Sequence, residues 1–294
     1  MCRKMFYLLS FALVFGLGAA SSQAAPPPAP WANQDIGSPT PGSADYNPAT
    51  QAVTIVANGN DIWNNADNFH FVYREFSGDC TITARVASFS TGSNSWRKAG
   101  VMIRDDLTAG AAFVDEVVTG GDGGGSGFQW RDSANGGCGW DQGGITGTSP
   151  PHWVRLVRTG NSFTGWLSED GDTWVQQGAA HTTVMTDPIS IGLAVTSHAT
   201  GELVTAVIDN VRGSVSFGPY YKASQPKPTN NSTVDADAVV LEWSPGDAAV
   251  SHDVYVGTSF SDVNTSAGAV YKGRQSELKY PFDPLDPFAS MPLI

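Results

Sequence analysis

Short runs of Val, Ile, Thr and aromatic residues, separated by turn-forming residues, are the feature that most restricts the folds open to this chain. Runs such as HFVYREF, CTITARVASF, AGVMIRDD and ISIGLAVTS follow one another between residues 31 and 217, and Gly, Asn, Asp or Pro stands between most of them. No stretch of useful length has the helical period of apolar residues. Short strands at this spacing predict an all-β fold, a two-sheet jelly-roll sandwich.

Alternation within the runs predicts which face each strand buries. In AGVMIRDD, Val101 and Ile103 point one way, whereas Met102 and Arg104 point the other. We expect the first pair, with the apolar alternate positions of other runs, to build the core between the sheets. The second pair is expected on an outer face, where a jelly roll often presents a concave polar surface.

The N-terminus has the pattern of a secretory signal. Arg3 and Lys4 precede the apolar run MFYLLSFALVFGLGAA, and the small residues of SSQAA follow it. The run is shorter than the roughly 20 apolar residues of a membrane-spanning helix, and no second apolar run follows. We therefore expect a signal peptide over 1–25, no membrane span, and a protein that is secreted or lies at the cell surface.

Composition divides the rest of the chain into segments. PPPAP at 26–30 predicts a stiff Pro-rich spacer, and the strand-rich region 31–217 predicts one jelly-roll domain. Residues 218–233 are rich in Pro, Lys, Asn and Ser, which is typical of a linker. Residues 234–294 hold two further strand-like runs but fall short of the ~100 residues of a complete sandwich. We expect a short, incomplete β-sandwich module there.

The net charge of the chain limits the classes of molecule that it is expected to bind. The formal net charge is −12 and the sequence pI is about 4.6. Nucleic acid and anionic membranes need clusters of Lys and Arg, which are absent, so we expect neither as a partner. An acidic surface is compatible with neutral carbohydrate. Neighbouring modules of a larger exported protein are further candidate partners.

Five motifs together resemble one family of domains. In order over roughly 31–215, they are PWANQDIG, GNDIWNNADNFHFVYREFSGDCTITARV, WRKAGVMIRDD, HWVRLVRTGNSFTGWLSEDGDTW and IGLAVTSH. The family is a concanavalin A-like, LamG-like jelly roll that carries the inherited label "regulation of enolase". A similar domain forms the C-terminal part of some β-xylosidases. The resemblance implies a concanavalin A-like fold but no particular activity, because one fold hosts many functions.

The tail resembles a fibronectin type III-like module. The resemblance runs from VVLEWSPG to SELKY. Such a module continues with a strand rich in Tyr and Trp, whereas here DPFASMPLI follows. The departure implies that the module over 234–294 is partial.

The carboxyl groups do not favour catalysis. Glycoside hydrolysis needs two carboxyls at a defined separation, and jelly-roll glycanases usually carry them as E-x-D-x-x-E on one strand face. The chain has no such motif. Asp115 and Glu116 come nearest to it, but adjacent residues of a strand face opposite ways. We therefore expect a protein that is not an enzyme, with a glycoside hydrolase as the least favoured interpretation.

Aromatic and planar polar side chains favour carbohydrate binding. Sugars stack on flat rings through their C–H faces and hydrogen-bond through their hydroxyls. Tryptophans beside loops and polar residues on strand faces predict a binding surface that includes Trp96, Arg104, Gln129, Trp130, Arg131 and Trp140. Trp130 shares a strand face with Phe128 and is equally compatible with the core. In the alternative, the tryptophans pack internally, the arginines are solvated or ion-paired, and the domain is a structural or protein-interaction (adhesion) module.

Calcium and a disulfide are further candidates. Loop carboxylates of exported jelly rolls often hold calcium, and Asp61, Asp79 and Asp122 are plausible ligands, although none has EF-hand spacing. No other cofactor is indicated. After removal of the signal, Cys80 and Cys138 remain. In an exported protein they either pair as a disulfide or stay unrelated thiols.

The segment SFTGWLSEDGDTWVQQG predicts a β-hairpin. Its two strands are expected over 162–168 and 173–177. Asp170 and Gly171 supply the turn, because Gly tolerates positive φ and the Asp carboxylate accepts backbone N–H groups. We expect Trp174 to pack against the hairpin or the edge of the core.

Overall fold

The computed structural model of the chain shows a protein built from β-strands. It describes residues 4–5, 7–11, 25–37, 40–120, 125–143, 145–218, 224–227, 233–234, 240–245, 250–257, 263 and 270–281. Residues 20–218 form one compact unit, and residues 1–19 together with 219–294 form a second.

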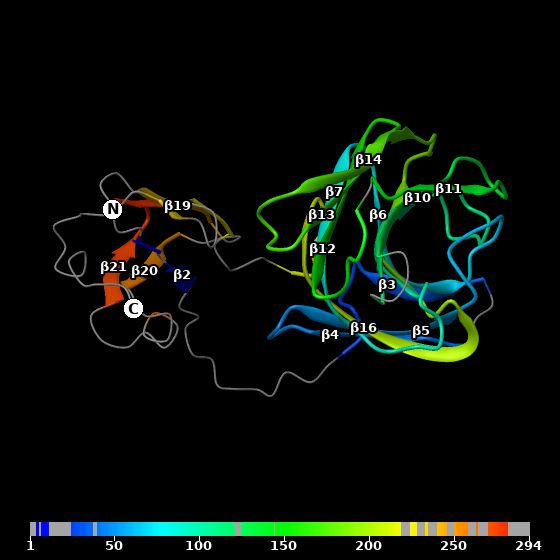
Figure 1. Ribbon diagram of the computed structural model, residues 1–294, viewed down its shortest axis with the longest axis horizontal. Helices are drawn as coiled ribbons and strands as arrows, with labels where there is room; N and C mark the ends of the chain where they lie inside the picture. The colour runs from blue at the N-terminus through cyan, green and yellow to red at the C-terminus, as the bar shows by residue number, and fades with distance from the viewer. Residues whose placement is uncertain are drawn as a thin grey trace. The chain divides into compact units, whose positions relative to one another are not determined.

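Two seven-stranded antiparallel sheets make up the unit of residues 20–218 (Figure 1). In spatial order, the first sheet consists of β11 (Cys138–Asp141), β10 (Ser126–Arg131), β9 (Phe113–Thr119), β8 (Lys98–Arg104), β15 (Ile189–Thr196), β6 (Phe69–Phe76) and β3 (Ala32–Ile36). The second consists of β14 (Val175–Thr182), β13 (Ser162–Ser168), β12 (His152–Thr159), β7 (Cys80–Phe89), β16 (Ala199–Gly213), β5 (Ala52–Gly59) and β4 (Ser43–Asn47). The predicted two-sheet jelly-roll sandwich is confirmed.

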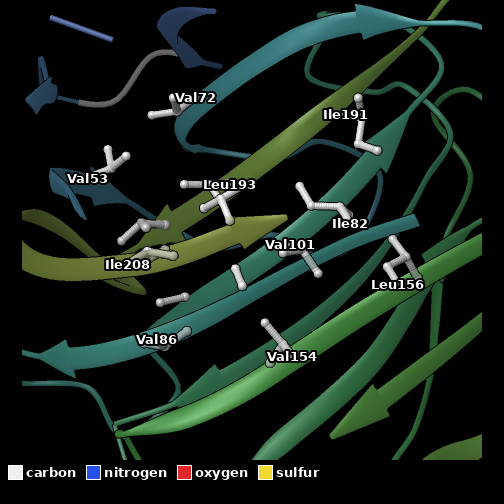
Figure 2. Close-up of a cluster of buried hydrophobic side chains, with 14 of the residues drawn as sticks. Val53, Val72, Ile82, Val86, Val101, Val154, Leu156, Ile191, Leu193 and Ile208 are labelled. Atoms are coloured by element: carbon white, nitrogen blue, oxygen red, sulfur yellow. The ribbon is translucent and has the colours of Figure 1, made fainter. Parts of the chain in front are cut away.

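The core between the sheets uses the alternate apolar positions of the strands. Val101 and Ile103 of β8 have no exposed surface. They belong to one buried cluster with residues of both sheets, including Val53, Val72, Ile82, Val86, Val154, Leu156, Ile191, Leu193 and Ile208 (Figure 2). Each such side chain contributes about 1.5–3 kcal/mol when it is fully buried. The faces predicted for the core are therefore confirmed.

Loops cover the outer face of the first sheet. Ile62 from the segment between β5 and β6 packs against Met102 and Phe113 of the sheet, and Leu107 from the segment between β8 and β9 packs against the same cluster. Ile62, Met102 and Phe113 are fully buried. The prediction that Met102 and Arg104 lie on an exposed concave surface is therefore wrong, because Ile62 and Leu107 from the covering segments bury this face.

The two ends of the sandwich domain meet. The Trp31 ring stacks on Phe217 with 4.0 Å between centroids, and the Tyr46 ring also stacks on Phe217 at 5.2 Å. Trp31 Nε1 donates to the carbonyl oxygen of Ser216 at 2.8 Å. These contacts join the residue before β3, β4 and the segment after β16, so the first and last residues of the sandwich share one packing site.

The described residues of the second unit form three small antiparallel sheets. They are β1 (Lys4–Met5) with β18 (Thr233–Val234), then β17 (Ser224–Lys227), β19 (Val240–Ser244) and β22 (Lys279–Pro281), then β2 (Tyr7–Phe11), β20 (His252–Gly257) and β21 (Tyr271–Gln275).

Export would remove β1 and β2, which lie in the expected signal peptide. Signal peptide, linker and fibronectin type III-like module stay predictions. Among the described residues, no helix is long and apolar enough to cross a membrane.

Candidate functional site

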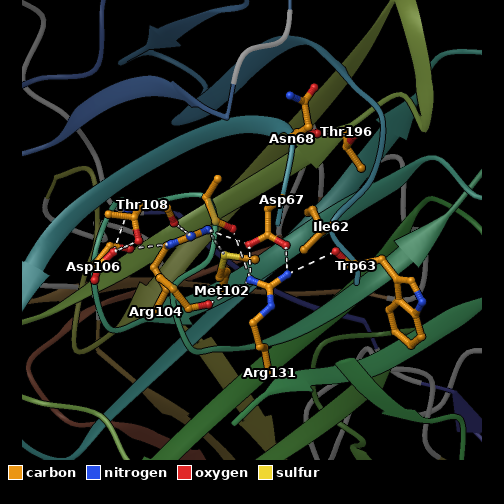
Figure 3. Close-up of polar contacts among 12 residues, drawn as sticks. Ile62, Trp63, Asp67, Asn68, Met102, Arg104, Asp106, Thr108, Arg131 and Thr196 are labelled. Atoms are coloured by element: carbon orange, nitrogen blue, oxygen red, sulfur yellow. Dashed lines mark hydrogen bonds and ion pairs between the residues drawn. The ribbon is translucent and has the colours of Figure 1, made fainter. Parts of the chain in front are cut away.

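Two of the predicted binding residues form a buried ion-pair cluster instead. Arg104 of β8 and Arg131 of β10 are fully buried, and both face the buried carboxylate of Asp67 (Figure 3). Arg131 is bidentate, with Nη1 at 2.9 Å and Nη2 at 2.5 Å from the two Asp67 oxygens. Arg104 Nη1 lies 3.4 Å from Asp67 Oδ2. Burial by itself lowers the pKa of Arg131, but hydrogen bonds and charge from Asp67 outweigh it and raise that pKa.

The remaining guanidinium donors hold the covering loops onto the sheet. Arg104 donates to the carbonyl oxygens of Asp106 and Thr108 at 2.7 and 2.5 Å. Arg131 donates to those of Trp63 and Asn64 at 3.2 and 3.1 Å. The prediction that Arg104 and Arg131 lie on an exposed binding surface is therefore wrong. A buried guanidinium is tolerated here because a carboxylate and backbone carbonyls satisfy its donors.

The described candidate calcium ligands have protein partners. Asp61 Oδ1 lies 2.7 Å from Lys98 Nζ, and Asp61 Oδ2 lies 3.0 Å from His198 Nε2. Burial raises the pKa of Asp61, but these two partners outweigh it and lower that pKa overall. Asp79 Oδ1 accepts from the Gly160 N–H at 2.7 Å, and Asp122 lies outside the described residues. No three His, Cys, Asp or Glu side chains gather as a metal site in the described part of the chain.

Cys80 and Cys138 are free thiols, so the candidate disulfide is not formed. Cys80 begins β7 of the second sheet and lies in the inter-sheet core, whereas Cys138 begins β11 of the first sheet. Cys138 Sγ donates to the Asn64 carbonyl at 3.1 Å. Burial raises the pKa of Cys80 to about 11 and that of Cys138 to about 12. Both groups therefore stay protonated at neutral pH.

Trp96 and Trp140 come together and stay accessible. Their rings meet edge to face, with 5.9 Å between centroids and 79° between planes. Trp96 is 37% exposed and Trp140 is 41% exposed. Trp130 has a different environment, because it stacks on His181 at 3.9 Å and packs against the inter-sheet core. Of the three predicted tryptophans, two form one accessible aromatic pair.

Trp140 belongs to a row of residues that crosses the outer face of the first sheet. Trp140 is opposite Gln129, Gln129 is opposite Asp115, and Asp115 is opposite Met102. Residues directly opposite each other in antiparallel strands present their side chains on the same face. Gln129 is 3% exposed and Asp115 is fully buried, so the prediction that Gln129 is exposed is wrong.

The oxygens in this row have no hydrogen-bond donor. Asp115 Oδ1, Asp115 Oδ2 and Gln129 Oε1 are buried without a partner. Burial is the main cause that raises the pKa of Asp115 well above its ordinary value. Buried polar atoms are nearly always paired, so three unpaired acceptors side by side mark this row as unusual.

Glu116 lies on the other side of β9. The Glu116 Oε2 atom is only 2.0 Å from the position where a Cβ on Gly165 of β13 would lie, so its carboxyl occupies the space between the sheets. Both Glu116 oxygens are also unpaired, as is Oε1 of Gln177, which is opposite Gly165 in the register. Burial raises the pKa of Glu116 well above its ordinary value, and the charge of Asp115 adds to this effect. The strand backbone separates the two carboxyls.

Sequence reasoning missed a set of Trp–Arg contacts on the outer face of the second sheet. The Arg155 guanidinium lies 3.6 Å from the centroid of Trp174, and Arg212 lies 4.9 Å from that of Trp153. Burial, followed by repulsion from Arg212, lowers the pKa of Arg155 to about 10. The alternation in HWVRLVR places Trp153 and Arg155 opposite the buried Val154, which is the signal that could have found this face.

Comparisons with known proteins give only distant similarities. No family profile and no curated protein matches the chain. A functionally unknown protein of Saccharomyces cerevisiae is 18% identical, covers 63% of this chain and 97% of its own, and has a TM-score of 0.49. An immunostimulatory antigen and pseudo β-1,3-glucanase of Mycobacterium tuberculosis is 14% identical, with coverages of 65% and 94% and a TM-score of 0.36.

A third similar structure is the exoplasmic/lumenal domain of VIP36 in its Ca2+/Man-bound form. It is 12% identical, with coverages of 64% of this chain and 90% of its own, and its TM-score is 0.30. At these levels of similarity, the fold assignment rests on the strand topology of the chain itself, and function has to be argued from its own side chains.

Proposed function

We propose that the jelly-roll domain is a non-catalytic carbohydrate-binding or accessory module of an exported multidomain protein. The accessible pair Trp96 and Trp140 carries this proposal. Two tryptophans that remain more than one-third exposed present apolar rings to solvent at the edge of a sheet. Such rings stack on the C–H faces of sugars, and a net charge of −12 leaves neutral glycans as the compatible class.

The arrangement of carboxyl groups supports a role without hydrolysis. Retaining and inverting glycosidases place two carboxyl groups on either side of the scissile bond, about 5–10 Å apart, and both groups reach the substrate. Here Asp115 and Glu116 are buried on opposite faces of β9. The resemblance to concanavalin A-like domains labelled "regulation of enolase", followed by a fibronectin type III-like module, agrees with an accessory role at the cell surface.

Affinity electrophoresis of the full chain through gels that contain soluble neutral polysaccharides tests this function. We expect a β-glucan, a xylan or a mannan to slow the wild-type protein. Trp140→Ala and Trp96→Ala should each weaken this binding about tenfold, which corresponds to roughly 1.4 kcal/mol. Leu203→Ala is the control, because Leu203 is an apolar residue 50% exposed on β16 of the other sheet.

Binding that survives both tryptophan substitutions would contradict the placement of the site. Absence of retardation by every polysaccharide would contradict the function and favour the alternative, a structural or protein-interaction module. All variants should keep the wild-type melting temperature, since each altered side chain is more than one-third exposed.

A further inference from the structure

The row Trp140–Gln129–Asp115 joins an accessible aromatic ring to buried acceptor atoms. Neighbouring strands lie about 4.8 Å apart. The Gln129 backbone is therefore about 5 Å and that of Asp115 about 10 Å from the backbone of Trp140, on the same face. These separations match the size of one or two sugar rings. A sugar stacked on Trp140 could therefore extend over Gln129 and Asp115.

Neighbouring cationic groups do not satisfy these acceptors. Lys98 Nζ is engaged by Asp61 and by the Ile62 carbonyl at 2.7 and 3.0 Å. Arg131 is engaged by Asp67 and backbone carbonyls. A proton on Asp115 supplies a single donor for three acceptor atoms, Oδ1, Oδ2 and Gln129 Oε1. These three acceptor atoms therefore lack hydrogen-bond donors in the unliganded chain.

We propose that Gln129 and Asp115 form the polar end of the glycan site at Trp140, where they accept hydrogen bonds from the hydroxyl groups of a neutral sugar. This inference rests on the proposed function and specifies its ligand. Sugar hydroxyls bring donors for these unpaired acceptor atoms. Carboxylate and sulfate groups bring only further acceptors, and the net charge of −12 repels polyanions. Neutral glycans are thus preferred over uronates or sulfated chains.

Access to the row requires the Gln129 side chain to move. Both polar groups are covered in the unliganded chain. Gln129 leans over Gly127, where its nearest side-chain atoms are 3.4 Å from the position of an absent Cβ. Gln129 lies between Trp140 and Asp115 in the row, so a ligand that approaches from Trp140 reaches Gln129 before Asp115.

Asp115→Asn and Glu116→Gln form a matched pair for the test. Both replace a fully buried, unpartnered carboxyl on β9 with its amide, one on each face of the sheet. Each amide supplies donors to neighbouring acceptors, so both variants should melt at a higher temperature than the wild type. Asp115→Asn should also weaken binding to the neutral polysaccharide about tenfold or more, because Gln129 then pairs internally. Glu116→Gln should leave binding within twofold of wild type.

Wild-type affinity in Asp115→Asn would overturn the inference, as would equal losses in both variants. Gln129→Met is the second variant, since it keeps the length of the side chain without its polar atoms. It should weaken binding, and unchanged binding would count against the proposal. Tighter binding of polygalacturonate than of a neutral polysaccharide would overturn the assigned ligand class. If Trp140→Ala abolishes binding while the Asp115 and Gln129 variants bind normally, the proposed function stands and this inference fails.

Discussion

Asp67 shows why single residues of the site escape sequence analysis. The alternation of apolar and polar residues in the strands correctly predicts that Arg104 and Arg131 face away from the inter-sheet core. It does not predict which residues cover them. The carboxylate that neutralises Arg131 comes from a loop 64 positions earlier in the chain. Trp96 and Trp140 were predicted as accessible from their loop positions, and the structure adds that the two rings touch.

Asp67→Asn is expected to destabilise the domain strongly. The substitution leaves two buried guanidinium groups without a counter-charge, and the loss of one partner from a buried pair costs about 3–5 kcal/mol. Urea unfolding followed by tryptophan fluorescence measures this loss. Asp209→Asn is the control, because Asp209 pairs with Arg85, which is 37% exposed, and such pairs contribute about 0–1 kcal/mol. Equal losses in the two variants would contradict the structural role of Asp67.

The hairpin of β13 and β14 is an element that local sequence predicted well. Asp170 Oδ1 accepts from the Asp172 and Thr173 N–H groups at 2.8 and 2.7 Å, and Gly171 has φ of +82°. The second strand begins at Val175, and Trp174 packs under Arg155, so the hairpin prediction is confirmed. Local turn chemistry sufficed here because every partner of Asp170 lies within three residues.

Asp170→Asn is expected to lower stability in a pH-dependent way. Burial is the largest single cause and raises the Asp170 pKa, but the hydrogen bonds from Thr173, Asp172 and Ser168 together outweigh it and depress that pKa. A depressed carboxyl pKa stabilises the fold above the unfolded-state value of about 3.9 and loses that contribution as pH falls through the folded value. Melting temperatures of wild type and Asn variant should therefore differ most well above the unfolded-state pKa of about 3.9 and converge as the pH falls through the depressed folded-state pKa.

Asp170→Ala serves as the companion variant, because it removes the turn-capping oxygen as well as the charge. It should stay less stable than wild type even at the acidic end of the titration. A constant difference between wild type and the Asn variant across the whole pH range would show that the Asp170 charge has no stabilising role.

At the scale of the whole sandwich domain, the two ends of the chain segment pack against each other. The Trp31, Tyr46 and Phe217 rings stack where the sandwich begins and ends. The expected boundary at residue 217 came from a change in composition. The reason for a boundary there is a tertiary contact, since the last aromatic residue before the expected linker packs against the first residue of the expected domain.

A fragment of residues 25–218 is expected to fold without the rest of the chain. It keeps both seven-stranded sheets and the aromatic stack at the ends of the chain. Near-ultraviolet circular dichroism should show a single cooperative unfolding transition. A fragment that ends at Val215 should melt at a lower temperature, because Trp31 loses both the Phe217 ring and the Ser216 carbonyl. A non-cooperative transition in the longer fragment would contradict this expectation.

The strands, their buried faces and the hairpin turn can be predicted from the sequence alone, because they follow from a period of two and from contacts between near neighbours. The tertiary structure alone decided which outward-facing residues stay outside. Asp67, which is distant in sequence, pairs with the buried Arg104 and Arg131, whereas Trp96 and Trp140 stay accessible. The same packing left Asp115 without a donor. Burial of polar groups depends on pairing across the fold, and no local pattern encodes that pairing.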